Sequence, residues 1–356
     1  MDIVVGLGHP AHVHFYRNPI NELETRGHEV HVVTKKRPLA IDLLNAYNIE
    51  HEVAGRWRIQ HHNRLKTGLS FFSFEFDVIN AVGKYNPDVV TGIGNIPLAH
   101  ASSIFDCTSV IFTDTEHASF ANSITFPFAD YIYTPEFCRS DIGPKHRKYP
   151  SYHELAYLHP TRFTPDPNVL DKIGLNEDDR FVILRTVDWN AIHDVGDSGI
   201  DSIHDIVEGF ERRGTNVLIT AEGEIPEPLT DRRISIESHR IHHLMYYADL
   251  YIGESATMAT ESAVLGTPAI YISTYECGNT NELDEQYGLV FNYHNDERQQ
   301  DAFERAISIL EDYSTEEWER RRKRMLEDRI DLTPFIVDKL LTIDGDRTDG
   351  GNSSGE

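Results

Sequence analysis

Residues 242–274 constrain the fold more than any other part of the sequence. Two apolar, β-favouring runs, residues 250–252 and 269–272, flank a loop of small and capping residues and a short helical pattern that ends at Gly266. A strand, a helix and a second strand form the repeating unit of a parallel sheet. A helix N-terminus carries unpaired N–H groups and a partial positive charge, so the loop is suited to a phosphate or diphosphate. The loop residues predicted to hold that group are Glu254, Ser255 and Thr257.

Glu261 follows one turn into the same predicted helix. A carboxylate at this place can accept hydrogen bonds from the paired hydroxyls of a ribose. The alternative is an ordinary βαβ crossover in which Glu261 is a solvated helix residue. A single motif of this kind does not decide between the two, and both interpretations stay open.

Length and charge bound the class of protein. The chain has 356 residues, enough for two domains that each bury a core. Its formal net charge is −25, from 58 acidic and 33 basic residues, which excludes the basic footprint of a nucleic-acid-binding protein. An acidic excess spread over a chain without low complexity is typical of a heavily hydrated surface. We therefore expect a folded, halophilic protein from a high-salt cytoplasm.

The three cysteines, Cys107, Cys138 and Cys277, form no CxxC pair, so neither a disulfide framework nor a cysteine zinc site is indicated. The N-terminus begins with a short strand pattern instead of a secretory leader. No window reaches the roughly 18 to 20 apolar residues of a membrane span. These features predict a reduced, cytoplasmic protein and leave a peripheral contact with a membrane surface open.

Strand and helix patterns alternate along the whole chain. Residues 3–7 form a buried strand pattern, residues 15–26 an amphipathic helix pattern that ends at Gly27, and residues 29–34 the next strand. This is the opening βαβ unit of a doubly wound α/β sheet, in which ligands sit at the carboxyl ends of the strands. The sequence thus predicts two Rossmann-like domains facing a cleft. The expected boundaries are a domain over residues 1–150, a linker over 151–172, a second domain over 173–343 and a disordered tail over 344–356.

The turn after the first strand admits three interpretations. Gly6, Gly8 and Ala11 fit the dinucleotide pattern G-x-G-x-x-A, but the next strand ends in basic residues and Pro10 removes an N–H from the loop. The histidines at positions 9, 12 and 14 suggest a metal, although no ligand cluster lies near them in the sequence. The favoured interpretation is that His12 is a general base with a pKa close to the working pH.

Four segments together resemble a known family. Residues 6–34, 110–118, 184–199 and 253–273 are similar to those of the domain of unknown function 354 family, and the likeness extends over about residues 1–340. That family resembles the GT-B glycosyltransferase superfamily, with relatives among the nonhydrolysing UDP-N-acetylglucosamine 2-epimerases and the lipid-linked N-acetylglucosaminyltransferase of cell-wall synthesis. The resemblance implies a GT-B-like fold of two Rossmann-like domains.

The resemblance also implies roles for individual residues. Gly8, Ala11 and His12 match the small-residue loop that approaches the sugar diphosphate and the acceptor, with the histidine as catalytic base. The first loop has Pro10-Ala11 in place of the double glycine of the transferases. The implied donor-nucleotide contacts of the second domain are Arg185, Trp189, His193, Glu254, Ser255, Thr257 and Glu261.

Two chemistries and one non-catalytic role stay open. A glycosyltransferase of surface polysaccharide or glycolipid assembly needs a base such as His12, a nucleotide-sugar donor, most simply a UDP-sugar, and a saccharide or lipid-linked acceptor. A sugar-nucleotide epimerase needs an acid–base pair, for which Asp114 and Glu116 resemble the acidic pair of the epimerases. The third possibility is a nucleotide-sugar-binding or scaffold protein. Neither chemistry calls for a cofactor or a metal, and either is compatible with a homodimer.

Overall fold

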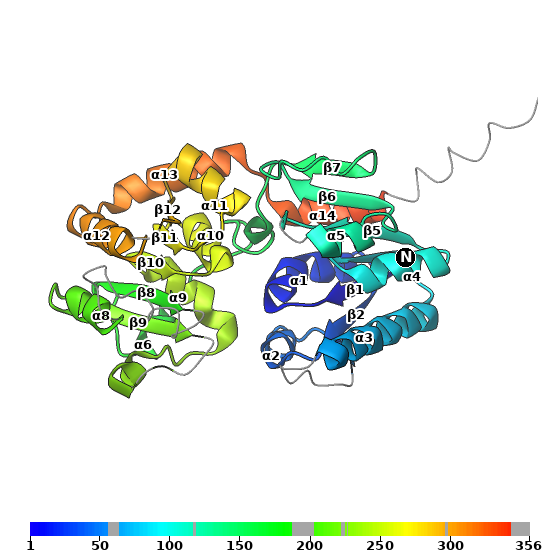
Figure 1. Cartoon of the computed structure of the whole chain (residues 1–356), viewed down its shortest axis with the longest axis horizontal. Helices are drawn as coiled ribbons and strands as arrows, with labels where there is room; N and C mark the ends of the chain where they lie inside the picture. The colour runs from blue at the N-terminus through cyan, green and yellow to red at the C-terminus, as the bar shows by residue number, and fades with distance from the viewer. Residues whose placement is uncertain are drawn as a thin grey trace, which may run out of the picture. The chain divides into compact units, whose positions relative to one another are not determined.

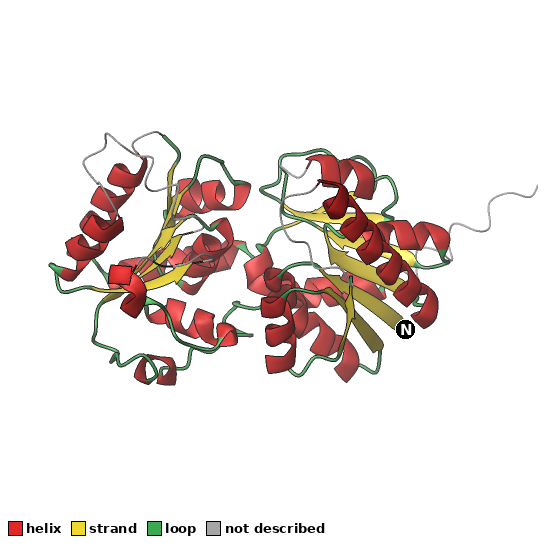
Figure 2. Ribbon diagram, turned by 60° about the horizontal axis from the view of Figure 1, so that its bottom comes forward, coloured by secondary structure: helices red, strands yellow, loops and turns green. Residues whose placement is uncertain are grey.

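The computed structural model describes residues 1–55, 64–116, 119–186, 203–221, 225, 227–295 and 298–342. The chain forms two compact units. The first joins residues 1–162 to the segment that starts at Ile330, and the second spans residues 163–329 (Figure 1). Each unit is built on a parallel sheet with helices on both faces (Figure 2). The predicted fold class, two doubly wound α/β domains, is therefore confirmed.

The sheet of the first unit has seven parallel strands in the order β3-β2-β1-β4-β5-β6-β7. Its strands are β1 (Asp2–Leu7), β2 (Glu29–Lys35), β3 (His51–Ala54), β4 (Val89–Ile93), β5 (Thr108–Phe112), β6 (Tyr131–Pro135) and β7 (His146–Tyr149). Its helices are α1 (Pro10–Thr25), α2 (Pro38–Ala46), α3 (Arg64–Tyr85), α4 (Ile96–Ile104), α5 (Ser119–Thr125), the 3₁₀ turn η1 (His153–Ala156) and α14 (Leu332–Leu341). The strand order reverses between β1 and β4, and doubly wound sheets bind ligands where this happens.

The second unit carries five parallel strands in the order β12-β11-β10-β8-β9. The strands are β8 (Phe181–Thr186), β9 (Asn216–Ala221), β10 (Leu250–Gly253), β11 (Ala269–Ile272) and β12 (Val290–Tyr293). The helices are α6 (Asn168–Asp171), α8 (Ile203–Glu211), α9 (Ile241–Tyr247), α10 (Ala256–Leu265), α11 (Gly278–Glu282), α12 (Arg298–Glu311) and α13 (Thr315–Asp328), with short turns η2 (Glu227–Arg232), η3 (Ser238–Arg240) and η4 (Leu283–Tyr287). Here the order reverses between β8 and β10, as in flavodoxin-like sheets.

The strands are buried because both faces of each sheet are covered. Four successive apolar or small residues of β1, Ile3 to Gly6, are inaccessible to solvent, which explains the uninterrupted apolar pattern of this strand. Helix α1 buries Phe15, Ile20 and Leu23. Burying each of these side chains contributes about 1.5–3 kcal/mol of transfer free energy. The first βαβ unit is thus specified by apolar periodicity alone.

The predicted domain boundaries differ from those of the structure at both ends of the second domain. Residues 151–162, predicted as linker, belong to the first unit, and Tyr152, Leu155 and Tyr157 are buried in it. Helix α14, predicted as the end of the second domain, packs against α1 and η1 of the first unit. Its apolar side chains Ile336 and Leu340 are fully buried there. The prolines suggested that residues 151–162 form a linker, but the aromatic residues of this segment are buried in the first unit and make it part of that unit.

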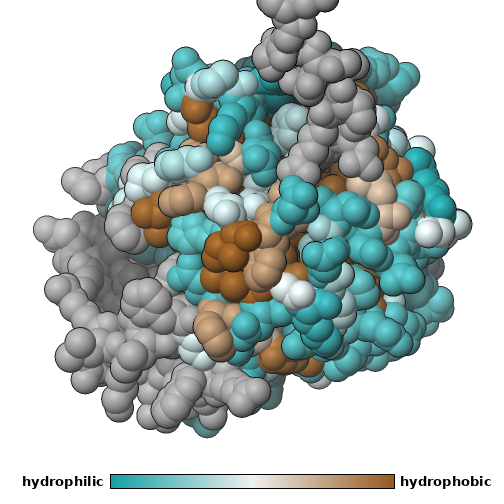
Figure 3. Space-filling model, turned by 90° about the vertical axis from the view of Figure 1, so that its right-hand side faces the viewer, coloured by the Kyte–Doolittle hydropathy of each residue, from teal (hydrophilic) through white to brown (hydrophobic). Residues whose placement is uncertain are grey.

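Figure 3 shows one face of the surface. Most of its coloured residues are hydrophilic, and several separate apolar groups lie among them. No helix among the described residues is both long enough and apolar enough to cross a bilayer. The predicted disordered tail, residues 344–356, lies outside the described residues.

Candidate functional site

The switch point of the second unit brings the predicted phosphate loop beside Arg185. Ser255 caps α10, since its hydroxyl accepts the Met258 N–H at 3.3 Å, and the first intrahelical bond runs from Ala259 N to Ser255 O at 3.0 Å. The amides of Ala256 and Thr257 precede that bond, so they are orphan donors at the positive end of the helix. The structure therefore has the capped helix N-terminus that the sequence predicted, with two amides that precede the first intrahelical bond.

Arg185 lies next to this terminus because β8 and β10 pair at their carboxyl ends. Arg185 is in register with Gly253, and Glu254 N–H donates to Arg185 O at 3.2 Å. A Cβ on Gly253 would lie 2.5 Å from Arg185 O, a distance that side chains do not tolerate. The guanidinium of Arg185 donates to Thr220 Oγ1 at 3.1 Å. Gly253 thus permits the close approach of the Arg185 backbone to the loop before α10, and the Arg185 guanidinium lies against Thr220 of β9.

Glu261 is buried, so the interpretation of it as a solvated helix residue is wrong. Its Oε1 lies 2.8 Å from His242 Nε2, and the two side chains are only 6% and 2% exposed. His242 comes from α9, which packs against α10. The pairing of His242 with Glu261 could not be predicted from the sequence, because 19 residues separate the partners and only helix packing brings them together.

Tyr251 joins these groups at the base of the site. Its hydroxyl donates to Ser255 O at 3.3 Å. Burial raises the pKa of Tyr251; the positive charge of Arg185 opposes that shift, whereas the Glu261 carboxylate adds to it. The Tyr251 hydroxyl thus ties β10 to the residue that caps α10. Two further predicted contacts, Trp189 and His193, lie outside the described residues.

In the first unit, the loop after β1 is closed by two imidazoles. His9 caps α1 by accepting the Ala11 N–H at 3.3 Å, and His12 Nδ1 accepts the Gly8 N–H at 3.3 Å. A Cβ on Gly8 would meet only the His12 ring, at the ordinary contact distance of 3.8 Å. His14 is buried and bonded to Tyr47 Oη at 3.1 Å. The three histidines therefore have separate structural partners and do not converge as metal ligands.

The predicted pKa of His12 is wrong. Burial, and then the charges of His9, His153 and Arg37, lower the pKa of His12 from 6.5 to about 3. The imidazole is therefore neutral near pH 7, and because Nδ1 accepts the Gly8 N–H, its proton is on Nε2. A neutral ring with its proton on Nε2 donates a hydrogen bond there and does not act as a base. The sequence could not show this, because the effect comes from burial and from the loop amide.

Asp114, just after β5, pairs with a histidine that the sequence did not single out. His153 Nδ1 lies 3.3 Å from Asp114 Oδ2, while Thr115 Oγ1 donates to Asp114 Oδ1 at 3.1 Å. His153 is buried between the rings of Phe15 and Tyr149, at centroid distances of 4.6 and 6.4 Å. Burial lowers the pKa of His153 and the Asp114 carboxylate opposes the shift. His153 Nδ1 thus faces the Asp114 carboxylate from a buried position beside it.

Glu116 is bonded to the loop that follows β6. Its Oε1 accepts the N–H groups of Arg139 and Ser140, both at 2.8 Å, and the Ser140 hydroxyl at 2.7 Å. These bonds fix the loop after β6 to the exit of β5. Of the two carboxylates predicted as an acid–base pair, Asp114 thus lies against His153 and Glu116 is held by the loop.

The described residues offer one group with the spacing of metal ligands. Asp2, Glu29 and His31 place their ligand atoms within 4.8 Å of one another. They lie at the start of β1 and on β2, at the end of the sheet opposite to His12 and Asp114. This group does not belong to the predicted site.

A family comparison identifies the chain as a whole. The family model described as protein of unknown function (DUF354) matches residues 1–342. The chain belongs to the DUF354 family. An uncharacterised protein of Methanocaldococcus jannaschii is 24% identical over 285 residues, which are 76% of this chain and 81% of that protein.

Solved structures show that this DUF354 protein has a GT-B-like fold. UDP-GlcNAc 2-epimerase from Neisseria meningitidis, solved with UDP-GlcNAc, aligns with a TM-score of 0.64 at 14% identity, covering 96% of this chain and 99% of that one. MnaA from S. aureus, solved with UDP, gives 0.67 at 13% identity, covering 98% and 97%. The Streptomyces glycosyltransferase SsfS6 gives 0.61 at 11% identity, covering 94% and 99%. Epimerases and transferases thus share this fold.

Proposed function

We propose that this DUF354 protein is a glycosyltransferase that uses a nucleotide-activated sugar, most simply a UDP-sugar, in surface polysaccharide or glycolipid assembly. One observation carries the proposal: Arg185 and the capped N-terminus of α10 meet at the strand-order reversal of the second unit. A guanidinium and orphan helix amides at a switch point are suited to a diphosphate. The neighbours solved with UDP and UDP-GlcNAc share the fold and support the same ligand class.

The donor contacts follow from this arrangement. The amides of Ala256 and Thr257 hold the diphosphate, and Arg185 neutralises its charge. Glu261, fixed by His242, accepts from the ribose hydroxyls. These groups stabilise the nucleoside diphosphate more strongly as its bond to the sugar breaks, which is the electrostatic component of catalysis.

Asp114 takes the proton of the acceptor. Its side chain is 25% exposed, so a hydroxyl can reach it, whereas His153 is buried and acts as a positioning residue. The acceptor oxygen attacks the anomeric carbon, its proton passes to the Asp114 carboxylate, and the bond between that carbon and the diphosphate oxygen breaks. The Nε2–H of His12 donates a hydrogen bond to a ligand oxygen at the β1 loop. In this proposal the general base is therefore Asp114, and His12 is a hydrogen-bond donor.

The epimerase alternative requires two acid–base groups around one sugar carbon. The bonds of Glu116 to Arg139 and Ser140 remove it from a pair with Asp114, which is the observation that favours transfer. The non-catalytic alternative predicts binding of a nucleotide sugar without any turnover.

Proton NMR of UDP-, GDP- and dTDP-sugars with the protein in concentrated salt tests the proposal. We expect the sugar nucleotide to stay unchanged with protein alone. When an acceptor extract is added, the sugar should pass to the acceptor and the nucleoside diphosphate should be released. Asp114→Asn should abolish this release while sugar-nucleotide binding persists, and Glu116→Gln should retain it. A new C2-epimer signal without acceptor, lost in both variants, would establish the epimerase instead.

A further inference from the structure

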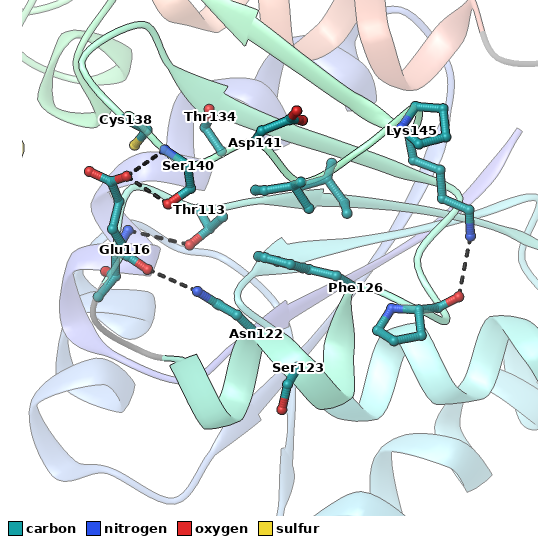
Figure 4. A pocket seen from close by; sticks show the side chains of 15 residues that line it. Thr113, Glu116, Asn122, Ser123, Phe126, Thr134, Cys138, Ser140, Asp141 and Lys145 are labelled. Atoms are coloured by element: carbon teal, nitrogen blue, oxygen red, sulfur yellow. Dashed lines mark hydrogen bonds between the residues drawn. The ribbon is translucent and has the colours of Figure 1, made fainter.

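A cavity of about 590 Å³ lies in the first unit beside the exit of β5. It is lined by α5, β6 and the loop that follows β6, and it opens to solvent (Figure 4). Phe126, Ile132 and Ile142 contribute to its apolar part, together with two prolines and Cys138, and polar side chains complete the lining. The polar residues used below are Thr113, Thr115, Glu116, Ser140 and Asp141. Its volume falls within the roughly 300–1,000 Å³ of small-molecule sites.

We propose that this cavity binds a saccharide unit of the acceptor that does not itself react. This inference rests on the proposed transferase function. An aromatic ring beside hydroxyls and carboxylates fits a polyhydroxylated ring, which has apolar C–H faces and an edge of hydroxyl groups.

The polar wall is fixed in advance of any ligand. The three hydrogen bonds from Arg139 and Ser140 hold the Glu116 carboxylate, and the two from Ser140 can be followed in Figure 4. Gly143 N–H donates to Asp141 Oδ1 at 2.9 Å. Carboxylates held in this way accept hydrogen bonds from ligand hydroxyls at little cost in side-chain entropy.

The charge of the wall selects against phosphates. Glu116 and Asp141 contribute two carboxylates, and the single lining lysine, Lys145, donates to the carbonyl oxygens of Pro127 and Ala129 at 3.3 and 2.7 Å. Placing a phosphate beside two carboxylates is unfavourable, because like charges repel. The ligand is therefore an uncharged or amino-bearing saccharide, and the nucleotide binds elsewhere.

The position of the cavity explains why its occupant does not react. Thr113 and Thr115 line the cavity, whereas Asp114 between them pairs with His153. Asp114 is not among the residues that line the cavity, although its neighbours Thr113, Thr115 and Glu116 are, so the cavity lies beside the Asp114 carboxylate and does not contain it. An acceptor with its reacting hydroxyl at Asp114 and a second unit in the cavity is at least two units long.

Saturation-transfer NMR on the full chain tests the cavity without knowledge of the natural acceptor. The probes are methyl β-glucoside, methyl N-acetyl-β-glucosaminide and methyl α-mannoside, with inorganic phosphate as the anionic probe. We expect at least one glycoside to bind, phosphate not to compete, and UDP not to displace the glycoside. Phe126→Leu should weaken glycoside binding about three- to tenfold, the loss expected for an aromatic contact.

The matched control is Phe128→Leu, because Phe128 is two residues away, is half exposed and packs on His100 outside the cavity. Its glycoside affinity should equal that of the unsubstituted protein. Asp141→Asn keeps an acceptor oxygen for Gly143 N–H and provides a second test if Phe126→Leu does not fold. No glycoside binding, displacement by UDP or phosphate, or equal affinities in all variants would overturn the inference. Failure of UDP to bind while a glycoside binds would contradict only the donor site.

Discussion

The buried pair of Glu261 and His242 makes the sharpest prediction about the donor site. Both side chains are almost inaccessible, and their polar atoms are 2.8 Å apart. Removing one partner of such a buried pair costs about 3–5 kcal/mol, because the other group is left without compensation. For a unit of this size each kcal/mol corresponds to about 2–4 °C in melting temperature. Glu261→Ala should therefore lower the melting temperature of the second unit by at least about 6 °C.

Calorimetry with a matched control checks this prediction. Glu237 forms a similar ion pair with Lys172, at 2.6 Å, but its side chain is 52% exposed. Because exposed pairs contribute little, Glu237→Ala should leave the melting temperature nearly unchanged. Glu261→Gln keeps a hydrogen-bond acceptor and should lie between the two. If Glu261→Ala is no more destabilising than Glu237→Ala, the buried pair does not exist and Glu261 is not a fixed ribose contact.

Three further perturbations test other parts of the account. Gly253→Ala should lower the melting temperature, because the added Cβ clashes with Arg185 O. Gly8→Ala should keep the melting temperature and lose only ligand affinity, because its Cβ has room. Equal melting temperatures of the two variants would contradict this difference. The pKa of His12 is lowered to about 3, so between pH 6.5 and 3 the unfolded chain binds a proton that the native state does not. The free energy of unfolding measured in urea should therefore fall as the pH drops below 6.5, by up to about 1.4 kcal/mol per pH unit. His12→Asn should reduce this dependence of stability on pH. Ile336→Ala should cost about 2–5 kcal/mol and lower the melting transition of the first unit; a loss in the second unit instead would contradict the assignment of α14.

Apolar periodicity and glycine positions were sufficient to predict the fold. Strand patterns such as residues 3–7 are buried on both sides, and Gly266 ends α10 in the left-handed conformation, with φ 96°, as a C-terminal glycine should. Ser255 caps α10 as predicted, because capping depends on neighbours in the chain. These elements could therefore be predicted because they depend on residues that are close together in the sequence.

Pairings between distant segments could not be predicted. His153 reaches Asp114 only because residues 151–162 fold back onto the first unit, and His242 reaches Glu261 only through helix packing. The pKa of His12 likewise depends on burial that no spacing reveals. Sequence patterns located the edge of the sheet where the site lies, but the partner of each side chain is a property of the tertiary structure.

Titration calorimetry of UDP tests the central claim most directly. The protein without substitution, Arg185→Ala and the surface control Arg212→Ala are compared in concentrated salt. Arg212 is a suitable control because its side chain is 68% exposed and, within the described part of the chain, pairs with Glu208 at 3.1 Å. The account predicts that UDP binds the unsubstituted protein and Arg212→Ala equally and that Arg185→Ala loses about 10- to 150-fold in affinity, the contribution of a charge-assisted hydrogen bond. Equal UDP affinities in all three proteins, or no binding to any of them, would contradict a nucleoside diphosphate site at Arg185 and α10.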